Sequence, residues 1–92
     1  MSKKINQDFR NKEKRDELQD ALKVEPRFEI TKETRDCFLL KFTGRQQVFP
    51  IIIVVNKLGY NAQVGKPKCT WASKHATHLL RSIESDLLRA AV

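Results

Sequence analysis

A run of eight apolar residues, Val48 to Val55, limits the folds open to this chain more than any other feature. Spanning a bilayer as a helix takes roughly 20 apolar residues, so the run is too short to cross a membrane. Its β-branched residues favour a strand, and apolar side chains on both faces are typical of a central strand. We therefore predict a strand over about Val48 to Asn56. Pro50 lacks an N–H, which indicates that regular pairing begins at Ile51 or that a bulge lies there.

Shorter segments with alternating apolar residues flank this run and predict further strands. Arg27 to Thr31 and Cys37 to Phe42 precede it, and Tyr60 to Val64 is a short fourth candidate. The polar stretches Lys32 to Asp36 and Thr43 to Gln47 have the length of hairpin loops.

Helices are predicted at both ends of the chain. Residues 3–23 have a helical composition, and Pro26 ends this element. Ile5 and Phe9 lie on a different helical face from Leu18 and its neighbours. Either the helix begins near residue 10 and residues 1–10 form a mobile arm, or these two side chains pack elsewhere. In the last element Thr70 is the expected N-cap, and one apolar stripe follows, consisting of Ala72, Ala76, Leu79, Leu80, Ile83, Leu87 and Ala90.

The expected fold class is α+β: an N-terminal helix, an antiparallel meander of three or four strands, and a C-terminal amphipathic helix packed on the sheet. A chain of 92 residues fits one small domain. Two helices cover one face of such a sheet and leave the other partly bare. A homodimer that pairs edges or faces is one hypothesis for covering it.

The net charge of +7 is unevenly distributed. Before Cys37 the acids and bases nearly balance, but from Cys37 to Ile83 there is no acid. This stretch carries only cations, namely Lys41, Arg45, Lys57, Lys66, Lys68, Lys74 and Arg81. Such segregation indicates an anionic partner, either a nucleic acid or an acidic protein surface.

Candidate binding residues gather around the start of the last helix. Trp71, His75, His78 and Ser82 are predicted to share the helix face opposite the apolar stripe, with Lys74 and Arg81 beside them. Aromatic side chains stack on bases or fill protein pockets, whereas lysine and arginine contact phosphates. The alternative is that Trp71 folds back into the core. Lys66 and Lys68 precede the helix N-terminus, where free N–H groups favour anions.

Cys37, Cys69, His75 and His78 invite comparison with a zinc site, but the paired Cys-x2–4-Cys spacing is missing. We therefore expect no metal and no cofactor. A Cys–His nucleophile pair drawn from the same residues has no orienting group and no oxyanion loop, so we expect no enzymatic activity.

The order helix, strands, helix loosely resembles a double-stranded-RNA-binding domain over residues 15–85. Pro26-Arg27-Phe28 corresponds to the opening of the first strand, and Ser73-Lys74 to the start of the final helix. Where that family carries a basic Lys-Lys-x-Ala-Lys stretch, this chain has Ser-Lys-His-Ala-Thr. The resemblance is architectural and does not establish membership.

The leading expectation is a non-enzymatic nucleic-acid-binding protein. Its phosphate contacts would come from residues 37–83, through Arg45, Lys57, Lys66, Lys68, Lys74 and Arg81, with Trp71 and, less strongly, Tyr60 adding stacking. The alternative is a small protein-interaction module of the phage- or plasmid-adaptor or inhibitor kind, which docks on an acidic protein surface. With two cysteines and no apolar leader, we expect a cytoplasmic protein.

Overall fold

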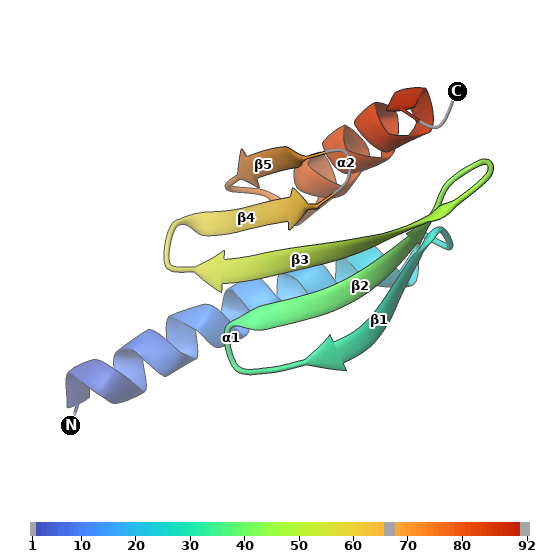
Figure 1. The fold of residues 1–92 in the computed structure, drawn as a ribbon. Helices are drawn as coiled ribbons and strands as arrows, with labels where there is room; N and C mark the ends of the chain where they lie inside the picture. Colours follow the sequence, from blue (N-terminus) through green and yellow to red (C-terminus); the bar gives the residue numbers. More distant parts are fainter. Residues whose placement is uncertain (1, 66–67, 91–92) are drawn as a thin grey trace.

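The computed structural model describes the backbone of residues 2–65 and 68–90, and the side chains of residues 12–65 and 68–89. The elements follow one another as α1 (Ser2–Lys23), β1 (Phe28–Glu33), β2 (Cys37–Thr43), β3 (Val48–Asn56), β4 (Gly59–Val64), β5 (Cys69–Ser73) and α2 (Ala76–Ala90). Figure 1 shows the strands side by side with the two helices behind them.

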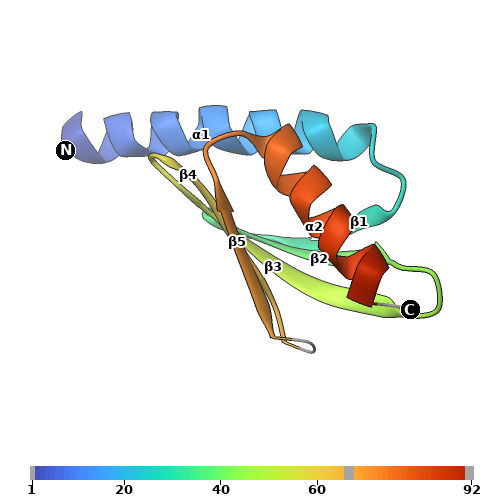
Figure 2. The ribbon, with the colours of Figure 1, turned by 90° about the horizontal axis from the view of Figure 1, so that it is seen from above.

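The described strands form one antiparallel sheet whose spatial order, β1-β2-β3-β4-β5, is the order of the sequence. The apolar run becomes β3, the central strand, as predicted. Both helices lie on the same face of the sheet, and Figure 2 shows them from above. The α+β architecture predicted from the sequence is therefore confirmed.

The sheet has one strand more than predicted. Cys69–Ser73 is strand β5, paired with β4 from Val64↔Cys69 to Tyr60↔Ser73, and α2 begins only at Ala76. Assigning Thr70 to a helix N-cap was therefore wrong. The N-cap position is His75, whose carbonyl accepts the first helical hydrogen bond, 3.0 Å from the N–H of Leu79. Ser73 shapes the turn before it, because its Oγ accepts a hydrogen bond of 3.1 Å from the N–H of His75. The sheet has five strands, whereas the resemblance to a double-stranded-RNA-binding domain rested on three, so the structure does not support that resemblance.

Pro50 is accommodated without a bulge in β3. Pairing with β2 is continuous from Thr43↔Val48 to Cys37↔Val54, so regular pairing does not wait for Ile51 on that side. Val55 donates its N–H to Asp36 on the β2 side, and by alternation the nitrogen of Pro50 faces β4. Since β4 pairs with β3 only from Ile51 onward, the missing N–H costs no ladder bond.

Helix α1 begins at Ser2, which confirms the helix predicted over residues 3–23 and excludes the alternative of a start near residue 10. Leu18, Ala21 and Leu22 are buried against the sheet, as their shared helical face predicts. The first turns of α1 extend past the sheet, as Figures 1 and 2 show.

The core lies between the sheet and the helices. Every second residue of the inner strands is buried there: Phe38, Leu40 and Phe42 from β2, Phe49, Ile51, Ile53 and Val55 from β3, and Tyr60, Ala62 and Val64 from β4. The predicted stripe of α2 covers them with Ala76, Leu79, Leu80, Ile83 and Leu87. Because these side chains come from every layer, the fold buries its apolar surface only when both helices dock.

A polar junction joins α1, β4 and α2 at one corner of the core. The Tyr60 hydroxyl donates a hydrogen bond of 2.6 Å to the Lys14 carbonyl, and the Lys14 ammonium donates one of 2.9 Å to the Lys74 carbonyl. The Glu17 carboxylate accepts a hydrogen bond of 2.8 Å from the N–H of Ala76, the first residue of α2. A side chain of one helix therefore caps the other.

We expect Glu17→Ala to lower the free energy of unfolding by about 1 kcal/mol, because the N-terminus of α2 loses both a hydrogen-bond acceptor and a favourable charge. Glu17→Gln keeps an acceptor oxygen and should lose less. Urea denaturation measures both. The exposed acid Asp20, which forms a surface ion pair with Lys23, provides the control variant Asp20→Ala. An equal loss in Glu17→Ala and Asp20→Ala would contradict the capping role.

Candidate functional site

The face of the sheet that the helices leave uncovered carries exposed apolar side chains. We call it the open face and define it by the outward residues of β2 to β5: Cys37, Leu39, Lys41, Val48, Pro50, Ile52, Val54, Asn61, Gln63, Thr70 and Ala72. Val48, Ile52 and Val54 are 53%, 37% and 42% exposed. Leu39 lies opposite Ile52 and Cys37 opposite Val54, so these side chains form a continuous apolar centre.

The open face is hollowed where β3 meets β4 and β5. A depression of about 510 Å³ there is lined by the apolar side chains of Ile52, Val54 and Ala72 and by the polar side chains of Asn61, Gln63 and Thr70. Strand β5 supplies part of the lining, so the misassigned segment turns out to extend this surface.

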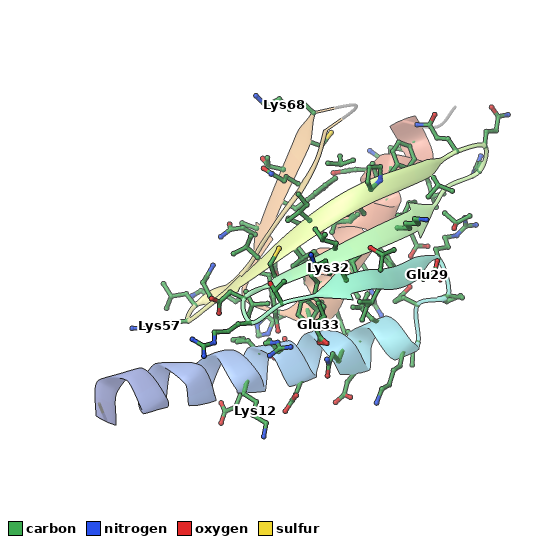
Figure 3. The ribbon with its side chains drawn as sticks, turned by 60° about the horizontal axis from the view of Figure 1, so that its bottom comes forward. Lys12, Glu29, Lys32, Glu33, Lys57 and Lys68 are labelled. Carbon is green, nitrogen blue, oxygen red and sulfur yellow. The ribbon has the colours of Figure 1, made fainter. Side chains whose placement is uncertain are left out.

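Cations stand at both ends of the open face. Arg45 lies between β2 and β3 and Lys68 lies just before β5, at the end where β4 finishes. Lys57 lies in the β3–β4 turn and Lys74 follows β5, at the opposite end. Figure 3 shows Lys57 and Lys68 far apart. The predicted basic residues therefore frame the sheet rather than form one patch, and Lys66 lies outside the described residues.

No described residue forms an ion pair with any of these framing cations. The ion pairs Lys14–Glu17, Arg15–Glu33 and Lys23–Asp20 all join residues of α1 and β1. The acids thus gather on the helix side and at the β1 edge, while the surface from β2 to β5 keeps its positive charge unpaired.

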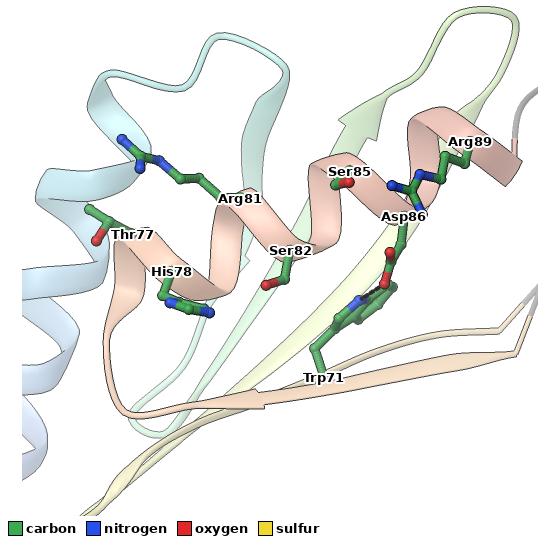
Figure 4. A pocket seen from close by; sticks show the side chains of 8 residues that line it. All are labelled: Trp71, Thr77, His78, Arg81, Ser82, Ser85, Asp86 and Arg89. Carbon is green, nitrogen blue, oxygen red and sulfur yellow. Dashed lines mark hydrogen bonds between the residues drawn. The ribbon is translucent and has the colours of Figure 1, made fainter.

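A second hollow, of about 630 Å³, lies between β5 and α2, which diverge from the corner at Ser73–Ala76 (Figure 4). We call it the wedge and define it by its lining residues: Trp71, Thr77, His78, Arg81, Ser82, Ser85, Asp86 and Arg89. The indole N–H of Trp71 donates a hydrogen bond of 2.8 Å to the Asp86 carboxylate. Figure 4 shows Arg89 beside Asp86, while Arg81 points away from Trp71.

The predicted helix face is only partly realised. Trp71 lies on β5 and His75 precedes α2, so they do not share a helical face with His78 and Ser82. The fold still brings Trp71, His78 and Ser82 together across the wedge, whereas His75 does not line it. Trp71 is half-buried and packs against the edge of the core, so its position lies between the exposed and the buried alternatives.

The two cysteines and two histidines that were compared with a zinc site are spread over the molecule. Cys69 opens β5 and His75 follows its other end, so the length of a strand separates them. Cys37 lies on the open face, whereas Cys69 pairs with the inward residue Val64. Among the described residues no three potential ligands of these types gather at one point.

Tyr60 is unavailable for stacking, contrary to the prediction. Its side chain is 1% exposed and its hydroxyl is bonded to the Lys14 carbonyl. Burial, and next the negative charge of Glu17, raise the pKa of the phenol well above its ordinary value near 10. The phenol is therefore a structural group of the α1–β4 contact.

No protein-family model, no curated protein and no solved structure matches this chain. In the part of the chain that the structure describes, no helix has the length and apolar character needed to cross a membrane. Function is therefore argued from the surfaces described above.

Proposed function

We propose that this protein is a non-enzymatic protein-interaction module whose open face docks on a partner with an apolar centre and an acidic rim. The observation that carries the proposal is the exposed apolar centre around Ile52 and Val54, framed by cations and free of acids from β2 to β5. Apolar patches of this kind, rimmed by polar residues, mark interaction sites in folded proteins.

The chemistry of the open face favours a protein partner over a nucleic acid. Its centre consists of aliphatic side chains, which gain free energy when an apolar surface covers them. Phosphates gain nothing there. Nucleic-acid-binding sheets stack bases on aromatic rings. Among the described residues Trp71 is the one aromatic residue at the hollow of the open face, and its indole is turned toward α2 and bonded to Asp86. Phe38, Phe42 and Phe49 all point into the core.

Charge determines the kind of protein that fits. In a face-to-face homodimer Arg45, Lys57 and Lys68 of one copy would approach the same cations of the other, which is unfavourable. A partner with aspartate or glutamate around an apolar patch pairs with the frame instead. The free thiols of Cys37 and Cys69 fit a reducing compartment such as the cytoplasm for this complex.

A second candidate is nucleic-acid binding, and the unpaired state of the framing cations favours it. Phosphates would then contact the ends of the sheet through Arg45 and Lys68 or through Lys57 and Lys74. Such binding weakens steeply with salt. It ranks second because the cations are divided between two ends and Trp71 is held by Asp86.

The double variant Ile52→Ser, Val54→Thr tests the first candidate. The partner is first captured by the wild-type protein from a nuclease-treated lysate. We expect the double variant to bind this partner with about tenfold lower affinity, because two apolar anchors are lost. Val24→Ser is the matched control, since Val24 is 74% exposed but lies after α1, away from the open face.

Three outcomes would count against this function. Loss of all captured material on nuclease treatment would favour the nucleic-acid candidate. Equal capture of the partner by the wild type and by Ile52→Ser, Val54→Thr would exclude the open face as the binding site. A light-scattering mass of two chains that returns to one in the double variant would assign the face to a second copy.

A further inference from the structure

The two edges of the sheet differ in how they are protected. The edge strand β1 carries Glu29, Lys32 and Glu33, and its register shifts between Ile30 and Lys32. Charged side chains and bulges are the usual means by which proteins prevent an edge from pairing with another chain. The edge strand β5, Cys-Thr-Trp-Ala-Ser, has neither a charge nor a register shift against β4.

The backbone groups on the free side of β5 can be identified from the register. The bond from Val55 to Asp36 shows which residues of β3 face β2, and alternation across β4 then assigns Cys69, Trp71 and Ser73 to the β4 ladder. Thr70 and Ala72 therefore direct their N–H and C=O groups outward. No described residue forms a hydrogen bond with these groups.

The wedge lies beside this edge, on the inner face. Cys69, Trp71 and Ser73, which face α2, are only half-buried, because α2 diverges from β5 as it leaves the corner (Figure 4). A strand added to β5 would lie about 4.8 Å beyond it, and its inward side chains would enter the wedge beside Trp71.

The wedge is suited to acidic side chains. Arg81 and Arg89 line it without an ion pair among the described residues, and Arg89 is the one on the side of Trp71 and Asp86. The hydroxyls of Thr77, Ser82 and Ser85 also belong to the lining. Its only acid, Asp86, is occupied by the indole N–H of Trp71. Aspartate or glutamate entering the wedge would therefore meet unneutralised cations and hydrogen-bond donors.

We propose that the free edge of β5 binds an extended acidic segment of a partner protein as a sixth strand, with an acidic side chain of that segment in the wedge. Main-chain bonds to Thr70 and Ala72 supply affinity, and the arginines of the wedge supply selectivity. This site adjoins the open face at Thr70 and Ala72, whose side chains belong to that face. It uses their outward main-chain groups and the wedge on the inner side of the sheet, so the proposal does not depend on which molecule covers the open face.

Selection of random linear peptides on the purified protein tests the proposal. We expect the enriched peptides to be acidic and strand-forming, and to bind Ala72→Pro about tenfold more weakly than the wild type, since proline removes an outward N–H. Ala72→Thr changes the side chain but keeps that N–H, so it should lose less affinity than Ala72→Pro. Arg89→Gln should weaken acidic peptides, whereas Arg45→Gln, at the end of the open face, should not.

A measurement on the peptide side avoids dependence on the folding of Ala72→Pro. N-methylation of a selected peptide at alternate residues should abolish binding in one register and spare it in the other, as an added strand requires. Enrichment of non-acidic peptides, or equal effects of N-methylation at every residue, would overturn the proposal. So would loss of the peptide in Ile52→Ser, Val54→Thr, which would place it on the open face.

Discussion

Gly59→Ala is expected to lower the free energy of unfolding by about 3 kcal/mol, a large part of the stability of a domain of this size. A Cβ at Gly59 would lie 2.3 Å from the carbonyl oxygen of Ser73 and 2.8 Å from the Cα of Lys74. Both are backbone atoms of the β5–α2 corner, so no side chain can rotate away. The φ of +156° at Gly59 adds strain for any residue with a side chain.

Thermal and urea denaturation measure this loss, which corresponds to a fall in Tm of about 15 °C. Gly65→Ala is the matched control, because a Cβ built there meets no atom within 4 Å. We expect that variant to unfold within about 0.5 kcal/mol of the wild type. If the two variants unfold together, the corner is not packed as described.

Alkaline pH is expected to destabilise the protein through Tyr60. Because burial raises the pKa of this phenol in the folded state, the unfolded chain ionises first. The stability that the neutral phenol contributes is complete below pH 10 and is lost as pH rises above it. The loss amounts to about 1.4 kcal/mol per pH unit until the folded phenol ionises as well.

Tyr60→Phe separates this effect from the titration of lysines, which both proteins share. At neutral pH the variant should lose about 1 kcal/mol with the bond to the Lys14 carbonyl. Above pH 10 its stability should fall less steeply than that of the wild type. Tyr60 is the single tyrosine, so phenolate absorbance reports it directly and should appear only as the chain unfolds. Phenolate formation near pH 10 in the folded protein would contradict this assignment.

Local alternation was enough to predict most of the sheet. The segments that became β1, β2, β3 and β4 place large apolar side chains at every second position, and hairpin-sized loops join them. β5 was missed because its inward residues are a cysteine, a tryptophan and a serine, which give no clear apolar alternation. Ala72 and Ala76 are four residues apart, which is helical spacing, so Ala72 was assigned to the apolar stripe of the last helix. The strand exists because the edge of β4 offers it a ladder, which is a non-local cause.

The candidate site was harder to predict than the fold. Charge counting along the chain located the cations but not their separation, since successive turns of an antiparallel meander lie at alternate ends of the sheet. Arg45 and Lys68 are thereby divided from Lys57 and Lys74. Trp71 and His78 were expected to share one helical face, but they line the wedge from two different elements, β5 and α2. The unprotected edge of β5 could be identified only from the register of the strands in the sheet.

Since the strands are ordered in space as they are in sequence, each one pairs with the segment made just before it. Every hairpin can therefore close during synthesis without waiting for a distant partner, and such local closure favours rapid folding. The long-range step is the docking of the helices. Lys14 and Glu17 of α1 form their hydrogen bonds only after Tyr60 and Ala76 have been synthesised, 46 and 59 residues later in the chain. The polar junction is thus where the N-terminal helix, the sheet and the C-terminal helix are joined in the last step of folding.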